Sequence, residues 1–185
     1  MKLGLGPEQY GLNYGVSNKK GTHLESEDAH ILEFAKQSNF KFIDTAPNYG
    51  NSESILGDLL KFDVKIGTKI PSMISGDKEL IFDIYSKSLT HLKKSSLYSL
   101  LIHNPDNLLS NTGDIVFEAM KDLKQNELVS KIGVSVYSPV ELEAILDRFD
   151  IDIVQFPLNI FDQRFLKIIP LLKKRNIEIH IRSIF

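Results

Sequence analysis

Seven short hydrophobic runs alternate along the chain with segments whose apolar residues recur at helical spacing. The runs are rich in β-branched residues and cover residues 2–6, 41–45, 64–70, 97–103, 131–137, 152–157 and 178–185. The segments with helical spacing cover residues 26–38, 52–61, 77–92, 113–125, 139–148 and 164–174. No hairpin turn signal joins two runs, so each strand should return to the sheet through a helix. The alternation therefore predicts an α/β fold with parallel strands and right-handed crossovers.

Start signals support several of the predicted helices. Ser26 and Asp77 precede acidic or mixed charged residues, and Asp114 stands at the head of its segment. Ser138 is followed by Pro139, which suits the first position of a helix. We therefore expect helices to begin at these four places.

Polar residues mark the carboxyl ends of five successive runs. They are Asp44, Lys69, His103, Ser135 and Gln155. In an open parallel sheet only the strands at the switch point face one ligand, whereas in a (β/α)8 barrel every strand end borders the same mouth. The ring of polar ends therefore favours a (β/α)8 or TIM barrel. An open dinucleotide-binding sheet is disfavoured, because the first run lacks the complete glycine-rich fingerprint.

Composition and charge exclude several other function classes. The net charge is −2, with acidic and basic residues interspersed, so we expect no nucleic-acid partner and no binding to an anionic membrane. No apolar run approaches the ~18 residues that a membrane span needs. Cysteine is absent, which removes thiol catalysis and cysteine-ligated metals and suits the cytosol. We expect a cytoplasmic protein without a metal site, since the histidines show no ligand spacing with carboxylates.

Four of the polar residues suggest carbonyl chemistry. Tyr49 follows Asp44 by five residues in the stretch FIDTAPNYGNSE, and Lys69 and His103 end the next two strands. A tyrosine is a poor acid at neutral pH unless a cation stabilises its phenolate, and Lys69 held by Asp44 would supply that cation. His103 and Tyr49 together would polarise a carbonyl oxygen and stabilise an oxyanion. Each residue alone suits a structural role, but the four together predict carbonyl reduction.

The chain also resembles the aldo/keto reductase family over residues 3–185. The resemblance lies in the motifs LGLG, DTAPNYGNSE, IGTK, LLIHNPD, KIGVS and DIVQFPLN. It implies a (β/α)8 TIM barrel of the aldo/keto reductase type that binds NADPH at its carboxyl mouth and reduces an aldehyde or ketone to an alcohol. It further implies a catalytic tetrad of Asp44, Tyr49, Lys69 and His103, in which Tyr49 is the proton donor.

The resemblance assigns cofactor contacts to three further residues. Ser135 and Gln155 match positions that hold the nicotinamide carboxamide in this family. Arg182 falls where many members place an aromatic residue, and its guanidinium could stack on the nicotinamide instead. The family often has a threonine where this chain has Pro7 and an asparagine where it has Val136, so each departure removes one possible polar contact.

A third departure concerns length. The chain shows seven of the eight strand–helix units of such a barrel, so we expect residues 1–185 to be a single, incomplete aldo/keto reductase-like domain and a segment of a longer enzyme. The loops that carry the cofactor phosphate site would be missing. Expressed alone, the segment should associate through its open sheet edges and bind NADPH weakly.

Two alternatives stay open from the sequence. Lys69 could form a Schiff base in an aldolase on the same barrel, although Asp44 nearby would oppose the lowered pKa that this chemistry needs. A non-catalytic or regulatory protein, or an inactive fragment without the cofactor phosphate site, would also keep these motifs. Neither the carbonyl substrate nor the oligomeric state is indicated by the sequence.

Overall fold

The seven predicted strands form one parallel sheet. The computed structural model describes residues 3–13, 25–72 and 77–184. Within them each strand pairs with the next along the chain, in the order β1 to β7. The strands are β1 (Gly4–Leu5), β2 (Phe42–Asp44), β3 (Lys65–Ile70), β4 (Leu97–Ile102), β5 (Val129–Ser135), β6 (Ile153–Pro157) and β7 (Glu178–Arg182). The prediction of a parallel α/β fold is confirmed.

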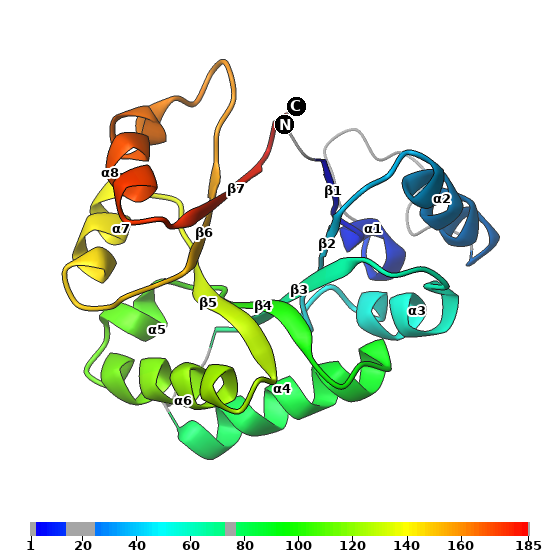
Figure 1. The fold of residues 1–185 in the computed structure, drawn as a ribbon, viewed down its shortest axis with the longest axis horizontal. Helices are drawn as coiled ribbons and strands as arrows, with labels where there is room; N and C mark the ends of the chain where they lie inside the picture. The colour runs from blue at the N-terminus through cyan, green and yellow to red at the C-terminus, as the bar shows by residue number, and fades with distance from the viewer. Residues whose placement is uncertain (1–2, 14–24, 73–76, 185) are drawn as a thin grey trace.

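The helices lie on the outer, convex side of this sheet (Figure 1). They are α1 (Glu8–Gly11), α2 (Glu25–Gln37), α3 (Ser52–Leu59), α4 (Lys78–Leu92), α5 (Asp106–Leu109), α6 (Gly113–Gln125), α7 (Pro139–Leu146) and α8 (Ile169–Lys174). The short helices α1 and α5 were not predicted, because four residues are too few to show a helical period. None of the helices in the described part of the chain is long and apolar enough to cross a membrane.

The sheet curls into an incomplete barrel. The rings of Phe42 on β2 and His180 on β7 meet edge to face with centroids 4.4 Å apart, although four strands lie between them. Tyr98 on β4 donates a hydrogen bond of 2.6 Å to Glu178 on β7 across the same interior. In the view of Figure 1 the curl brings β7 round toward β1. The architecture is the predicted (β/α)8 type with seven strands in place.

Two of the four predicted helix starts, Asp77 and Ser138, cap their helices as expected, whereas Ser26 lies within α2 and α6 begins one residue before Asp114. The side chain of Asp77 accepts a hydrogen bond from the backbone of Glu79, and Ser138 forms a capping box with Glu141. The predicted single helix over 164–174 is wrong, because a 3-10 turn, η1 (Arg164–Lys167), precedes α8. Pro170 explains the break, since a proline in the second turn of a helix has no N–H to continue the hydrogen-bond ladder.

Two different environments lie on the two sides of the sheet. The layer between strands and helices is largely apolar and includes Leu56, Ile81, Leu100, Val116 and Phe156, all fully buried. The interior of the curl contains charged groups at its amino end. Burial raises the pKa of Glu178 there, but hydrogen bonds from Lys131, Tyr98 and His180 outweigh burial and lower the pKa to about 2. The carboxylate therefore stays ionised and links β7 to β4 and β5.

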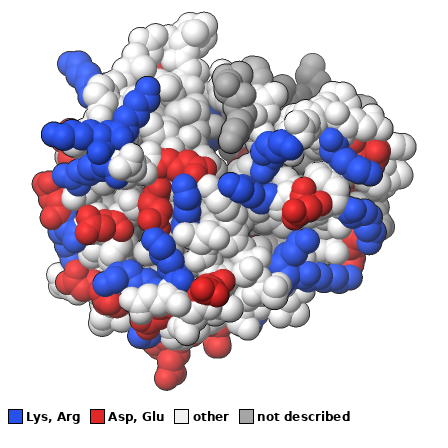
Figure 2. All heavy atoms as spheres, in the orientation of Figure 1, with Lys and Arg blue, Asp and Glu red and all other residues white. Residues whose placement is uncertain are grey.

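The surface carries mixed charge. On the face shown in Figure 2, lysine and arginine side chains alternate with aspartate and glutamate side chains over most of the molecule. Many of these groups form pairs, such as Lys121 with Glu118 at 2.8 Å and Arg164 with Asp162 at 2.8 Å. Exposed pairs of this kind contribute little to stability, about 0–1 kcal/mol each.

Candidate active site

The turn that carries Tyr49 packs closely against α1. It follows β2 directly, and the backbone N–H of Tyr49 donates to the carbonyl of Ala46 at 3.0 Å. Gly50 has a φ of +58°, in the left-handed region that favours glycine. A Cβ on Gly11 would lie 2.0 Å from the carbonyl oxygen of Tyr49, so only glycine fits there. Gly11 and Gly50 therefore fix the backbone position from which the Tyr49 side chain extends.

Lys69 joins Tyr49 to Asp44 inside the barrel. Its side chain is 1% exposed, and its Nζ donates to Asp44 Oδ2 at 2.8 Å and to the carbonyl of Thr45 at 3.0 Å. The third contact of the ammonium is the hydroxyl oxygen of Tyr49, at 3.3 Å. A buried ammonium is tolerated only when it is paired and hydrogen-bonded, and all three of its N–H donors have acceptors here. The structure thus brings Asp44, Tyr49 and Lys69 into one hydrogen-bonded group.

His103 completes the group from the next strand. It follows β4, and its backbone N–H donates to the carbonyl of Ile70 at 2.9 Å. Its ring meets the ring of Tyr49 edge to face, with centroids 6.0 Å apart. Burial, reinforced by the cation of Lys69, lowers the pKa of His103 to about 4. The imidazole is therefore neutral near pH 7 and has one N–H to donate.

The lowered pKa of His103 predicts a pH dependence of stability. Above its ordinary pKa of 6.5 the residue is neutral in both the folded and the unfolded chain. As the pH falls from about 6.5 to about 4, only the unfolded chain takes up this proton, so the free energy of unfolding should decrease across that window. Urea titrations at several pH values would measure it. His103→Gln should show a smaller decrease, and an equal decrease would contradict the assignment.

Ser135 and Gln155 lie next to each other beside this group. They are paired in register on β5 and β6, and both are buried. The Nε2 of Gln155 donates to Asp44 Oδ2 at 3.0 Å, so one carboxylate oxygen accepts from both Lys69 and Gln155. The sequence did not indicate this contact, because the two residues are 111 positions apart and no local pattern pairs them.

The arrangement of these groups suits a primary amide ligand. Since Asp44 can only accept, the NH2 end of the Gln155 amide must face it, which leaves the amide oxygen and the second N–H for another partner. The hydroxyl of Ser135 lies on the neighbouring strand, and among the described residues Asp44 Oδ1 is buried without a hydrogen-bond partner. Donors and acceptors of this kind fit the carboxamide of a nicotinamide.

Arg182, the last residue of β7, contacts the segment that directly follows β5. The carbon of its guanidinium lies 3.7 Å from the centroid of the Tyr137 ring, and Nη2 donates to the carbonyl of Val136 at 3.4 Å. One face of the guanidinium that was predicted to stack on the nicotinamide is thus already stacked on the Tyr137 ring. Arg182 is also one of the charges that lower the pKa of His103, after burial and Lys69.

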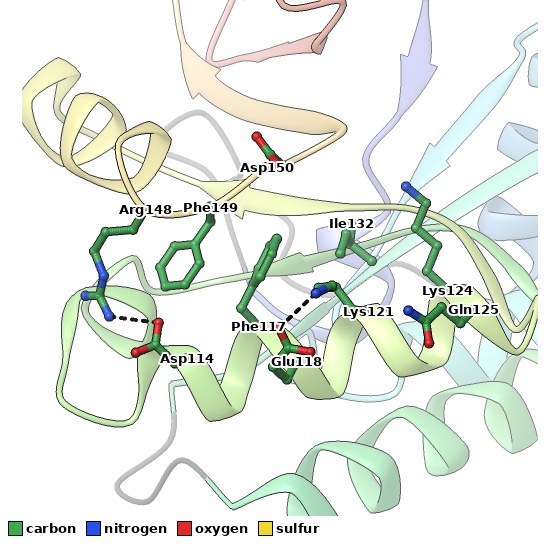
Figure 3. A pocket seen from close by; sticks show the side chains of 10 residues that line it. All are labelled: Asp114, Phe117, Glu118, Lys121, Lys124, Gln125, Ile132, Arg148, Phe149 and Asp150. Atoms are coloured by element: carbon green, nitrogen blue, oxygen red, sulfur yellow. Dashed lines mark hydrogen bonds and ion pairs between the residues drawn. The ribbon is translucent and has the colours of Figure 1, made fainter.

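A surface cavity lies apart from this site. It measures about 570 Å³ and lies over α6, β5 and the segment 148–150, with Phe117 and Phe149 among its lining residues (Figure 3). Its charged groups are largely satisfied within the chain, as in the ion pair of Arg148 with Asp114 at 3.3 Å. None of Asp44, Tyr49, Lys69 and His103 lines it. Within the described ranges no group of histidines and carboxylates could hold a metal ion.

Comparisons with known proteins identify the family. The model of the aldo/keto reductase family matches residues 2–185. The uncharacterized oxidoreductase YqkF of Bacillus subtilis (strain 168) is 25% identical over 167 residues, which are 83% of this chain and 54% of that protein. The chain therefore spans about half the length of this curated relative.

Solved structures share the fold. The putative aldo-keto reductase PA4992 from Pseudomonas aeruginosa superposes with a TM-score of 0.83 and 24% identity, covering 96% of this chain and 71% of that one. The holo form of AKR11C1 from Bacillus halodurans gives 0.80 and 21%, with coverages of 97% and 61%. The glycerol dehydrogenase AKR11B4 from Gluconobacter oxydans gives 0.75 and 22%, with coverages of 96% and 58%.

Proposed function

Because the chain belongs to the aldo/keto reductase family, we propose that it is an oxidoreductase that reduces an aldehyde or ketone to an alcohol with NADPH. The observation that carries the proposal is the hydrogen-bonded line from Asp44 through Lys69 to Tyr49, with His103 against the tyrosine ring. In this proposal Tyr49 is the proton donor and Lys69 is the cation that makes it more acidic. Asp44 is the anion that holds Lys69, and His103 is a neutral hydrogen-bond donor beside them.

Reduction of a carbonyl adds a hydride to carbon and a proton to oxygen. Reduced nicotinamide supplies the hydride when it is bound. In the proposal Tyr49 gives its hydroxyl proton to the carbonyl oxygen, because Lys69 at 3.3 Å stabilises the phenolate that remains. Asp44 and the carbonyl of Thr45 hold the ammonium in place. His103, neutral near pH 7, donates its N–H to the same oxygen as negative charge develops there.

Three residues are proposed to hold the cofactor. Ser135 and Gln155 would bind its carboxamide, since their hydroxyl and amide groups are buried beside the catalytic group. Arg182 would cover the ring with the guanidinium face opposite Tyr137. The choice of NADPH over NADH belongs to the same proposal and rests on the family alone.

The aldolase alternative is disfavoured by the contacts of Lys69. A Schiff-base lysine must lose its proton and expose a lone pair to the substrate. Lys69 is held by a carboxylate at 2.8 Å, which favours the protonated form, and the carbonyl of Thr45 and the hydroxyl of Tyr49 occupy its remaining donors. Borohydride treatment with a carbonyl substrate should therefore leave Lys69 unlabelled.

An assay of NADPH oxidation with a panel of aldehydes and ketones tests the proposed function. We expect oxidation that depends on the carbonyl compound and yields the alcohol. Tyr85→Phe serves as a matched control, because it also removes a buried tyrosine hydroxyl, one that donates to the carbonyl of Leu128 far along the chain from the site. Binding of NADPH without consumption by any carbonyl compound would favour a regulatory role instead.

A further inference from the structure

A buried carboxylate lies behind the catalytic lysine. Glu53 on α3 is 2% exposed and accepts a hydrogen bond of 2.6 Å from the hydroxyl of Thr68 on β3, which is 1% exposed. Thr68 directly precedes Lys69, and Glu53 follows Tyr49 by four residues. The bond therefore ties the strand that carries the lysine to the helix that follows the tyrosine turn.

The two neighbours on β3 point in opposite directions. Successive side chains of a strand alternate between its faces, so Lys69 points into the barrel while Thr68 points outward to α3. A force on Thr68 thus acts on the backbone that sets the position of Lys69. The residue before Glu53, Ser52, also anchors the start of α3. Its hydroxyl donates to the carbonyl of Pro7 at 2.9 Å and lies 3.2 Å from the hydroxyl of Thr45.

Packing alone does not require a carboxylate at position 53. Burying a carboxylate is costly unless it is well hydrogen-bonded, and an apolar side chain of similar size often stabilises a core as well or better. The Nδ1 of His91, a half-exposed side chain, lies 3.8 Å from Oε2 of Glu53. The far end of α3 already packs closely on α4, since a Cβ on Gly57 would lie 2.0 Å from the carbonyl oxygen of His91.

We propose that Glu53 is a positioning residue that, through Thr68, sets the separation between the Tyr49 hydroxyl and the Lys69 ammonium. The separation of 3.3 Å is at the outer limit of hydrogen bonding, so a shift of a few tenths of an ångström on either side decides whether the contact exists. The inference rests on the proposed role of Tyr49 as the acid. It adds that the acidity of Tyr49 depends on a hydrogen bond on the outer face of the sheet.

Thr68→Val tests the link, because valine keeps the shape and removes only the hydroxyl. The readout is the alkaline ultraviolet titration of Tyr49, obtained by subtracting the titration of the same protein that also carries Tyr49→Phe. We expect the midpoint to rise by about one pH unit, since the opposite charge moves away from the phenolate. Thr68→Ser should restore the original midpoint. Ser88→Ala, which removes a buried hydroxyl without a hydrogen-bond partner among the described residues, should leave it unchanged.

A second pair of variants covers the case in which Thr68→Val does not fold. Glu53→Gln and Glu53→Gln with Thr68→Val carry the same charge, and neither leaves a buried carboxylate without its donor. The double variant should titrate at a higher pH than the single variant by a similar amount. Equal midpoints within either folded pair would overturn the proposal. The titration needs neither cofactor nor substrate, so its outcome is independent of whether Tyr49→Phe abolishes turnover.

Discussion

Replacing Lys69 by methionine should lower turnover by ~10²- to 10⁴-fold, because Tyr49 loses the cation that stabilises its phenolate. The alkaline limb of the pH profile should also move to higher pH. Stability should fall too, by about 3 kcal/mol, since Asp44 keeps only the Gln155 donor after its charged partner is removed. Steady-state kinetics between neutral and alkaline pH and urea unfolding would measure the two effects.

Lys131→Met provides the matched control. Lys131 also pairs with an interior carboxylate, Glu178, but at the end of the barrel where the strands begin. That variant should lose stability and keep its pH profile. An unmoved profile in Lys69→Met, with turnover reduced only as far as the lost stability explains, would show that Lys69 has a structural role alone.

Tyr49→Phe should lower turnover by at least about a hundredfold while the affinity for NADPH stays nearly unchanged. The substitution removes the proton donor and leaves the ring in its contact with His103. Asp44 and Thr45 still hold Lys69, so the fold around it should be preserved. Turnover and cofactor titration by fluorescence would separate the two quantities. Equal turnover in Tyr49→Phe and the Tyr85→Phe control would exclude Tyr49 as the acid.

Much of the fold could be predicted because it depends on local patterns. Most strands show apolar runs more than polar alternation, as a sheet covered by helices requires, and Asp77 and Ser138 carry recognisable cap chemistry. The break before α8 was missed, since Pro170 lies inside a segment whose apolar spacing is otherwise helical. The charged interior around Glu178 was also missed, because its partners on β4 and β5 lie 80 and 47 residues away.

In the candidate site, too, the features that depend on strand position could be predicted, and those that depend on the curl of the sheet could not. The meeting of Asp44, Tyr49 and Lys69 followed from their places at the ends of neighbouring strands, which in a barrel border one mouth. The contact of Gln155 with Asp44 and the stack of Arg182 on Tyr137 depend on how far the sheet curls, and no single sequence encodes that curvature in a readable pattern. The bond between Glu53 and Thr68 was hidden for another reason, since a glutamate early in a helix is ordinarily solvated.

Transfer of deuterium from NADPH in which both hydrogens on the reactive carbon of the nicotinamide are replaced by deuterium tests the central proposal most directly. The protein is incubated with the labelled cofactor and an aldehyde, and the alcohol is analysed by mass spectrometry. We expect one deuterium on the carbinol carbon, formed at least about a hundredfold more slowly by Tyr49→Phe. An alcohol without deuterium, or equal rates of transfer in the two proteins, would contradict carbonyl reduction at the group formed by Asp44, Tyr49, Lys69 and His103.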